Sequence, residues 1–326
     1  MKACIDIGGT KVSVSLVASA GDVLPNADQF LARRSEPTAK TGAPDAVAQQ
    51  VLRLVSSACA QVGTPLDALQ AVGVASCGPF VMHDGLIALA APNICGGVAG
   101  PARGLPNDWL SAPLEAPLRA VFADRLQLEN DAVAALQAER RWGALQGLDH
   151  CGYLTWSTGI GFGLCVGGRV LRGKNGNAGH AGHMFVSDTN DAAALCGCGN
   201  VGDVEGLVAG NAIARRFAPQ GFADAAALLA AASAGDAAAL ARVDELCRVM
   251  GRTLYNLAVT LDLQRVSIGG SVFWHHQRLL LPRLQAQVDG KLAALTDGFT
   301  LVPAGLGERV GDFAALALVS PGIPPD

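Results

Sequence analysis

The sequence of 326 residues has few charged side chains and no cluster of positive charge. Charged residues make up 16% of the chain, and the formal net charge is −4. Nucleic-acid binding requires a clustered positive field, which this composition does not provide. The arginine pairs Arg140-Arg141 and Arg215-Arg216 are typical of helix surfaces. We therefore expect no nucleic-acid partner.

Long apolar runs are also missing, although half of the residues are apolar. No uninterrupted run is long enough to span a bilayer. The Ala-rich segment 225–241 is split by Gly235-Asp236 and predicts two helices. The first residues, MKACIDIGGTK, reach a charge at Asp6 and lack the apolar core of a signal peptide. We expect a cytoplasmic protein that does not enter a membrane.

A disulfide framework is not indicated by the nine cysteines. Their number is odd, and most lie in apolar runs, which is typical of reduced, buried thiols. Cys196 and Cys198 are the exception, because they lie close together in a glycine-rich setting.

The common glycine-rich nucleotide loops are absent as well. Residues 3–7 are mostly apolar, Gly8-Gly9 follow, and residues 12–16 alternate between apolar and polar. This pattern predicts two hairpin strands joined by a glycine turn. A Rossmann or Walker A loop would lead into a helix, and no G-x-x-x-x-G-K pattern occurs.

The strand–turn–strand design recurs in the second half of the chain. Residues 153–156 predict a strand, Ser157–Gly163 a glycine-rich turn, and residues 164–170 a strand that turns at Gly167-Gly168. A third glycine pair, Gly269-Gly270, follows a buried strand and precedes a helix that begins near Ser271. The repeat suggests a duplicated architecture with a cleft between its halves.

Helices and strands alternate between these turns, which places the chain in the α/β class. Residues 45–60 and 132–142 predict amphipathic helices, the second capped by Asn130-Asp131. We expect a domain boundary near Pro117–Asp124. It divides the chain into a domain of residues 1–118 and a domain of residues 119–305, with a helical segment 306–326 packing back on the first.

The glycine turns could direct backbone N–H groups at phosphates, because a turn without Cβ allows close approach. Thr10 and Thr158 add hydroxyl donors, and Asp6 could hold a hydrated magnesium ion. A single glycine pair is more often a plain turn, but three at strand ends favour a nucleotide. Asp131, at the positive end of a helix, could accept a proton from a substrate hydroxyl. A plain N-cap remains the alternative for Asn130-Asp131.

Residues 176–205 combine nitrogen and sulfur ligands with glycine. The segment contains two histidines (His180, His183), two cysteines (Cys196, Cys198), and then Asp203 and Glu205. Such spacing suggests a small loop held by a metal ion. Taken singly, His180 reads as a loop histidine, Glu205 as a first-turn carboxylate, and Asn93 as a turn residue after a proline.

Together these segments resemble the ROK family (repressors, open reading frames, kinases) over essentially the whole chain. DIGGTK at Asp6–Lys11 and STGIGFG at Ser157–Gly163 are similar to the two phosphate loops of the family. LENDAVAA at Leu128–Ala135 resembles its catalytic stretch. GNAGHAGH at Gly176–His183 and CGCGNVGDVE at Cys196–Glu205 are similar to its zinc-loop motif.

The resemblance implies an actin-like (ribonuclease H-like, duplicated) two-domain kinase, with ATP, magnesium and a sugar in the cleft, and it suggests a homodimer. It implies transfer of phosphate to the 6-hydroxyl of a hexose, with Asp131 as base. Glucose is the first candidate substrate, and N-acetylmannosamine or another N-acylhexosamine is the alternative. The implied sugar contacts are Gly78, Asn93, Asn130, Asp131, His180 and Glu205. The implied ATP and magnesium contacts are Asp6, Gly8, Gly9, Thr10, Lys11, Thr158, Gly159, Gly161, Gly269 and Gly270. The implied zinc ligands are His183, Cys196, Cys198 and Asp203.

The sequence departs from the family pattern at two of these residues. His180 replaces the usual glutamate, as in some members similar to bacterial N-acetylmannosamine kinases, and a histidine can donate as well as accept. Asp203 replaces the third cysteine of the zinc loop. A carboxylate is an acceptable zinc ligand, so the site is either Cys2HisAsp or weakened or empty. We expect a bound zinc ion in a structural role.

Two other classes of function remain in competition. A sugar-responsive repressor of the same family would carry a DNA-binding domain before the first phosphate loop, and Asp6 lies too near the start of this sequence for one. A redox or metal module centred on Cys196 and Cys198 would leave the glycine turns unexplained.

Overall fold

A computed structural model describes residues 1–18, 29–99, 104–189 and 191–320. Contacts between Cα atoms divide the chain into two compact units. Unit 1 comprises Met1–Arg141, Arg172–Ala178 and Gly311–Asp326, and unit 2 comprises Trp142–Leu171 and Gly179–Val310. The end of the expected C-terminal segment, 321–326, lies outside the described residues.

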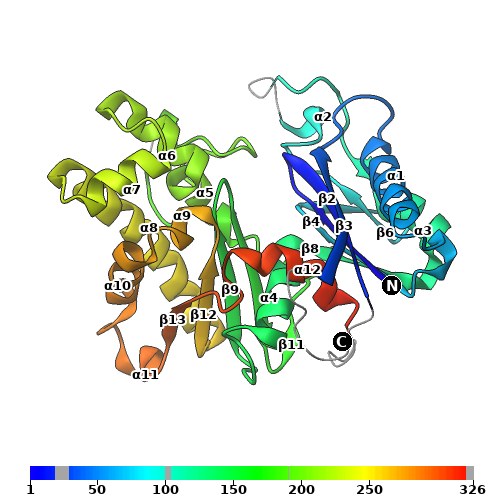
Figure 1. The fold of residues 1–326 in the computed structure, drawn as a ribbon. Coiled ribbons are helices and arrows are strands. Elements are labelled where there is room, and N and C mark those ends of the chain that lie inside the picture. The colour runs from blue at the N-terminus through cyan, green and yellow to red at the C-terminus, as the bar shows by residue number, and fades with distance from the viewer. Residues whose placement is uncertain (19–28, 100–103, 190, 321–326) are drawn as a thin grey trace. The chain divides into compact units, whose positions relative to one another are not determined.

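Unit 1 is built on a five-stranded mixed sheet with the order β3-β2-β1-β4-β8 (Figure 1). Its strands are β1 (Lys2–Ile7), β2 (Lys11–Val17), β3 (Phe30–Pro37), β4 (Ala71–Ser76) and β8 (Leu126–Asn130). β1 pairs antiparallel with β2 and parallel with β4, which confirms that the first glycine turn closes a hairpin. A second sheet contains β5 (Phe80–His83), β6 (Leu86–Leu89) and β7 (Ala112–Pro113).

One helix of unit 1 packs an apolar face on the five-stranded sheet. α1 (Ala46–Gln61) buries Val47, Val51, Leu54 and Ala58, which recur at helical spacing and face β2 and β3. The remaining helices are α2 (Gly96–Ala99), α3 (Glu115–Phe122), α4 (Asp131–Trp142) and α12 (Val310–Leu318). The carbonyl of Ala315 lies only 2.0 Å from where a Cβ of Gly73 would stand, so a glycine in β4 lets α12 approach the sheet closely.

Unit 2 repeats the topology of unit 1 with the strand order β11-β10-β9-β12-β13 (Figure 1). Its strands are β9 (Cys151–Trp156), β10 (Ile160–Val166), β11 (Arg169–Val170), β12 (Arg265–Gly269) and β13 (Thr300–Pro303). As in unit 1, the first strand of the hairpin, β9, pairs antiparallel with the next strand, β10, and parallel with a later strand, β12. The expected duplication is therefore present strand by strand.

The helices of unit 2 are α5 (Val204–Val208), α6 (Gly210–Phe217), α7 (Ala225–Ser233), α8 (Ala237–Leu261), α9 (Ser271–Trp274), α10 (Gln277–Val288) and α11 (Ala293–Thr296). The Ala-rich segment forms two helices, as expected, and Asp236 caps the second by accepting from Ala239 N at 2.8 Å. Among the described helices, none is by itself long and apolar enough to cross a membrane. α7 and α8 meet that criterion only as a pair, which is bent by 116°.

Two details differ from the sequence prediction. The second glycine turn is shorter than expected, because Gly161 and Gly163 lie within β10, where Gly161 pairs with Thr155. Phe162 between them is buried, so the alternation is that of a strand. The contact division also falls after Arg141 and not near residue 118, because β8 completes the sheet of unit 1 by pairing with β4.

A short return of the chain into unit 1 was not expected either. Residues 172–178 belong to unit 1, where Arg172 forms an ion pair with Glu129 at 2.6 Å. Asn177 holds the same segment by exchanging two hydrogen bonds with the backbone of Phe80, both at 2.7 Å. The motif GNAGHAGH therefore belongs to unit 1 up to Ala178 and to unit 2 from Gly179 onward.

Candidate functional site

Two carboxylates lie at one edge of the sheet in unit 1. β1, β4 and β8 run parallel, so their carboxyl ends meet at the same edge, where ligands bind in α/β sheets. Asp6 is the penultimate residue of β1, and Asp131 directly follows β8 as the first residue of α4. Gly78 lies two residues beyond the end of β4, at the same edge.

Burial raises the pKa of the Asp131 carboxyl to about 7, and the negative charge of Asp6 adds to this effect. Burial likewise raises the pKa of Asp6 to about 6, while the Lys11 ammonium opposes the rise. Both side chains are half-buried and keep some contact with solvent. A carboxyl group with a pKa near neutrality can take up a proton during a reaction and return it afterwards.

Asn130 is the N-cap of α4, and Asp131 Oδ1 also accepts a hydrogen bond from Ala132 N at 2.8 Å. The side-chain oxygen of Asn130 accepts hydrogen bonds from the N–H groups of Ala132 at 3.0 Å and Val133 at 3.3 Å. The plain N-cap reading thus applies to Asn130, whereas the role of Asp131 as a base stays a prediction. A hydrogen bond from the Asn130 side chain to Asp131 also favours the charged carboxylate.

The first glycine turn is packed against Asn93. A Cβ placed on Gly9 would lie 1.9 Å from Asn93 Nδ2, so glycine is required for this approach. Asn93 Oδ1 is buried and has no hydrogen-bond partner among the described residues. A buried acceptor without a partner is costly, and a ligand hydroxyl is a suitable donor for it.

In unit 2, the second and third glycine turns lie side by side. Ser157 N donates to Gly159 O at 3.0 Å and closes the turn between β9 and β10. Gly269 pairs with Thr155 across the parallel strands, and Gly270 has φ of +89°. A Cβ on Gly270 would lie 2.4 Å from the carbonyl oxygen of Trp156, next to the second turn.

Three further predicted contacts lie at or near the turns. Thr158 is exposed at the tip of the second turn, while Gly161 lies one residue inside β10. In unit 1, Thr10 is exposed in the first turn and Lys11 opens β2.

Glu205 contacts the second glycine turn. Its Oε2 accepts a hydrogen bond from Ile160 N at 3.0 Å, and a Cβ on Gly159 would lie 2.9 Å from the same oxygen. Its other oxygen, Oε1, lies 3.4 Å from Cys196 Sγ. Glu205 therefore lies between the glycine turn and the cysteine-containing loop.

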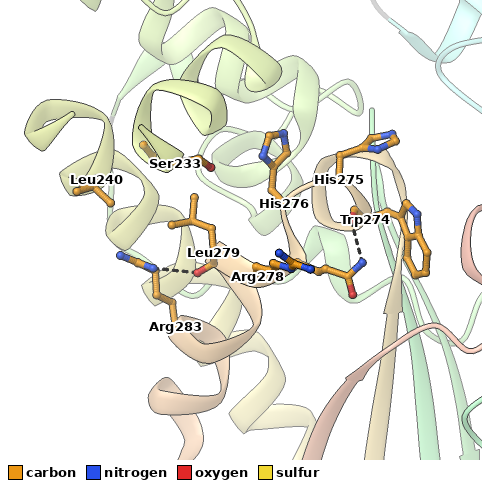
Figure 2. Close-up of a pocket in the computed structure, with 10 residues that line it drawn as sticks. Ser233, Leu240, Trp274, His275, His276, Arg278, Leu279 and Arg283 are labelled. Atoms are coloured by element: carbon orange, nitrogen blue, oxygen red, sulfur yellow. Dashed lines mark hydrogen bonds between the residues drawn. The ribbon is translucent and has the colours of Figure 1, made fainter. Parts of the chain in front are cut away.

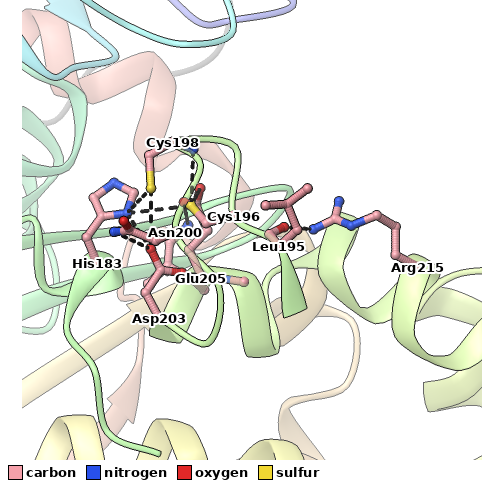
Figure 3. A network of polar contacts seen from close by, with 10 residues as sticks. His183, Leu195, Cys196, Cys198, Asn200, Asp203, Glu205 and Arg215 are labelled. Carbon is pink, nitrogen blue, oxygen red and sulfur yellow. Dashed lines mark hydrogen bonds and ion pairs between the residues drawn. The ribbon is translucent and has the colours of Figure 1, made fainter. Parts of the chain in front are cut away.

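The four predicted zinc ligands form one cluster (Figure 3). Asp203 Oδ2 lies 3.1 Å from His183 Nδ1 and 3.5 Å from Cys198 Sγ. The thiols of Cys196 and Cys198 lie 3.6 and 3.7 Å from His183 Nδ1. Ligands of a tetrahedral zinc ion, bound at about 2.0 to 2.3 Å, are separated by roughly 3.3 to 3.8 Å. The donor atoms and their spacing therefore fit zinc.

His180 lies next to this cluster. It directly precedes the short turn η5 (Ala181–His183), and its ring stacks on that of His183 with centroids 6.1 Å apart. Gly179, with φ of +87°, brings the backbone against the carbonyl of Phe162 in β10. The position of His180 thus depends on a ligand of the cluster and on the sheet.

A cavity of about 550 Å³ in unit 2 was not indicated by the sequence (Figure 2). Trp274 is one of the residues that line it. The backbone N–H of Trp274 donates to the carbonyl of Gly270 at 2.8 Å, so the cavity lies about one helical turn from the third glycine pair. Two of its side chains lie close to acids: His275 Nε2 is 3.2 Å from Glu308 Oε1, and Arg283 forms an ion pair with Asp244 at 3.1 Å. The remaining lining residues are mixed in character: Ala232, Leu240, Trp274 and Leu279 are apolar or aromatic, and Ser233, His276, Gln277 and Arg278 are polar or charged.

The predicted sugar contacts divide between the two units. Gly78, Asn93, Asn130 and Asp131 belong to unit 1, and His180 and Glu205 belong to unit 2. Each group lies at the turn-bearing edge of its own sheet. This arrangement, two α/β units of equivalent strand topology that each carry glycine turns and a carboxylate at one edge, is typical of a phosphotransferase of the duplicated, actin-like class.

Comparison with known proteins assigns the family. The profile of the ROK family matches residues 2–321. A glucokinase of Aeropyrum pernix is 28% identical, over 96% of this chain and 95% of its own length. An N-acetylmannosamine kinase of Escherichia fergusonii is 33% identical over 82% of each chain.

Solved structures agree with this assignment. A ROK hexokinase from Thermus thermophilus superposes with a TM-score of 0.74 at 30% identity, covering 97% of this chain and 96% of that one. A ROK glucokinase from Streptomyces griseus, in complex with glucose and AMPPNP, superposes with a TM-score of 0.69 at 25% identity, covering 96% and 97%. The chain belongs to the ROK family and has its actin-like two-domain fold.

Proposed function

We propose that this chain, an ATP-dependent sugar kinase of the ROK family, phosphorylates the 6-hydroxyl of a hexose, with glucose as the first candidate substrate. The observation that carries the proposal is the edge of unit 1, where Asp131 follows β8 and has a pKa raised to about 7. The buried, unpartnered Asn93 Oδ1 at the first turn supplies an acceptor for a sugar hydroxyl.

In this mechanism the residues position the reactants and stabilise charge. Asp131, when ionised, accepts the proton of the sugar 6-hydroxyl. The hydroxyl oxygen attacks the terminal phosphorus of ATP, and the bond from that phosphorus to ADP breaks, so that ADP leaves. Backbone N–H groups of the glycine turns would bind the phosphates, which can approach closely where no Cβ is present. Asp6 would hold magnesium, which when bound neutralises charge on the transferring phosphoryl group. The elevated pKa lets Asp131 hold the proton until product leaves.

Zinc has a structural part in the proposal. His183, Cys196, Cys198 and Asp203 would hold the ion, and four protein ligands leave no open position for catalysis. The ion would fix the loop that follows His180 and carries Glu205, the two sugar contacts of unit 2. Elemental analysis of the purified protein should find about one zinc per chain. A content near zero would exclude the ion from the proposal.

The cavity beside α9 suits the base of ATP. A purine stacks well on an aromatic face, and Trp274 provides one a single helical turn from Gly270. Trp274→Ala should therefore raise the KM for ATP several-fold and leave the KM for sugar unchanged. Equal changes in both constants would show that the variant perturbs the unit as a whole.

A coupled ADP-release assay over a panel of sugars tests the activity. The panel contains glucose, mannose, N-acetylglucosamine and N-acetylmannosamine, each at a fixed concentration of ATP and magnesium. We expect the highest kcat/KM with glucose. Absence of turnover with every hexose and amino sugar would defeat the kinase proposal and favour a sugar-binding regulator.

N-acetylmannosamine is the second candidate, and His180 is the observation that favours it. An imidazole in place of the family carboxylate presents an N–H donor where the family has only acceptors, which suits the carbonyl of an N-acyl group. His180→Glu should change the ranking of glucose, N-acetylglucosamine and N-acetylmannosamine. An unchanged ranking would remove His180 from the determinants of specificity.

A further inference from the structure

Asp203 uses its two carboxylate oxygens for two different purposes. Oδ2 faces the cluster, 3.1 Å from His183 Nδ1 and 3.5 Å from Cys198 Sγ. Oδ1 points the other way and accepts a hydrogen bond from Gly206 N at 2.7 Å. The side chain is fully buried, so neither oxygen is exposed to bulk water as an alternative hydrogen-bond partner.

The bond from Gly206 N makes Asp203 the N-cap of α5. This helix has five residues, and Glu205 is the second of them. A helix so short has little internal stability, so its first turn depends on its cap. Glu205 reaches Ile160 N from that first turn, and the position of its carboxylate therefore depends on the cap.

The backbone around the cap has no room to adjust. A Cβ on Gly206 would lie 2.3 Å from the carbonyl oxygen of Ala194 and 3.0 Å from Asp203 Oδ1. Gly202, with φ of +86°, sets the direction in which the chain enters the helix. A change in the orientation of Asp203 is thus transmitted to the first turn of α5.

We propose that Asp203 is a positioning residue that couples the metal site to Glu205, with Oδ2 as ligand and Oδ1 as helix cap. A cysteine here would offer a metal one sulfur atom, and sulfur is a weak acceptor for the Gly206 N–H. A carboxylate serves both groups at once. The inference rests on the proposed contact between Glu205 and the sugar.

Two substitutions separate the two roles of Asp203. Asp203→Cys keeps a ligand and loses the cap, so zinc should stay near one per chain while the amide of Gly206 exchanges faster with deuterium. The KM for sugar should rise about fivefold, because the loss of one N-cap changes the equilibrium constant for forming the helix by about that factor. The KM for ATP should stay unchanged. Asp203→Asn keeps an oxygen for the cap but replaces the anionic ligand, so zinc should fall well below one per chain.

A second pair of variants covers the case in which Asp203→Cys does not fold. Asp203→Ser can cap but is a poor ligand, and Asp203→Ala can do neither. Both should lack zinc, and the Ser variant should have the lower KM for sugar and the slower exchange at Gly206. Asp236→Cys is the matched control, because it removes the N-cap of α8 in the same unit. It should lower the melting temperature without changing zinc content or the KM for sugar.

The outcomes keep this inference distinct from the proposed function. If the unaltered protein phosphorylates no sugar, the proposed function fails, while zinc content and amide exchange still report on both oxygens. Full zinc in Asp203→Asn would overturn the ligand role. Normal exchange at Gly206 and a normal KM for sugar in Asp203→Cys would overturn the cap role.

Discussion

The two units have the same strand topology but differ in the chemistry at equivalent positions. In each unit the hairpin ends with one last pair, Ile7 with Val12 in unit 1 and Trp156 with Ile160 in unit 2. The residue before that pair is Asp6 in the first unit and the neutral Thr155 in the second. Unit 1 thus carries an acid where unit 2 does not.

The supports of the two edges differ as well. In unit 1 the edge is formed by strand ends, the cap of α4 and the contact of Gly9 with Asn93. In unit 2 the turn is bonded to Glu205, which contacts a cluster of metal-type ligands. The two units therefore share one topology, but unit 1 has carboxylates with raised pKa values at its edge, and unit 2 has a loop that is linked to the ligand cluster.

The largest effect is expected from Asp131→Asn. Loss of the base should lower kcat by a factor of about 10² to 10⁴, because the amide cannot accept the proton. Sugar binding, followed by calorimetry, should persist, since the side chain keeps its size. Asp124→Asn, at an exposed position of the same unit, serves as control. A loss smaller than tenfold would disprove the assignment of Asp131 as base.

A smaller effect is expected at the first glycine turn. In Gly9→Ala the new methyl group would displace the Asn93 amide, and the KM for sugar should rise about tenfold. Gly8→Ala is the matched control, because its Cβ would have an ordinary contact of 3.4 Å with the Lys11 carbonyl. Similar KM values for the two variants would argue against a role of Asn93 in sugar binding.

The pH dependence of kcat/KM should reflect Asp6 and Asp131, the two acids at the sheet edge of unit 1. Asp131 must be ionised to act as a base, so activity should fall as the pH drops through about 7. The charge of Asp6 raises the pKa of Asp131, so Asp6→Asn should move this limb to lower pH by roughly one unit. Thr155→Ser, at the equivalent position, should leave the limb in place. A shift to higher pH in Asp6→Asn would contradict the coupling.

The smallest effect concerns stability. The pKa of Asp131 is higher in the folded chain than its value of about 3.9 in an unfolded one. The folded state then binds more protons, so stability declines as the pH rises from about 4 to about 7 and stays reduced above. Asp131→Asn removes this penalty and should raise the melting temperature by a few degrees at pH 8. Below pH 4 the two proteins should melt alike, and a difference that persists there would have another cause.

Local patterns in the sequence predicted the elements that carry the site. Both hairpins, the strand before Gly269 and the break between α7 and α8 follow from alternation, glycine pairs and a capping aspartate. The spacing of histidines and cysteines predicted a loop held by a metal, and the resemblance to the ROK family implied which four residues are its ligands. These features depend on neighbours in sequence, so a single sequence suffices to identify them.

Features that depend on distant pairing were not predicted. β8 belongs to unit 1 only because it pairs with β4, and no local pattern near residue 118 records that contact. The return of residues 172–178 to unit 1 rests on Glu129 and Phe80, which lie far away in sequence. The cap formed by Asp203 has a local signal, since Asp before a helix is a common N-cap, but the five-residue length of α5 is set by contacts that the local sequence does not record.

The position of α12 has a consequence for synthesis of the chain. This helix is formed by residues close to the C-terminus, yet it packs on β4, and Asp312 forms an ion pair with Arg33 at 2.8 Å. Domains commonly fold from the N-terminus as the ribosome releases them. Here unit 1 begins the chain but includes α12, so unit 2, which extends to Val310, has all of its residues available before unit 1 does. A chain that ends just before α12 would therefore lack a helix that packs on strand β4 of unit 1.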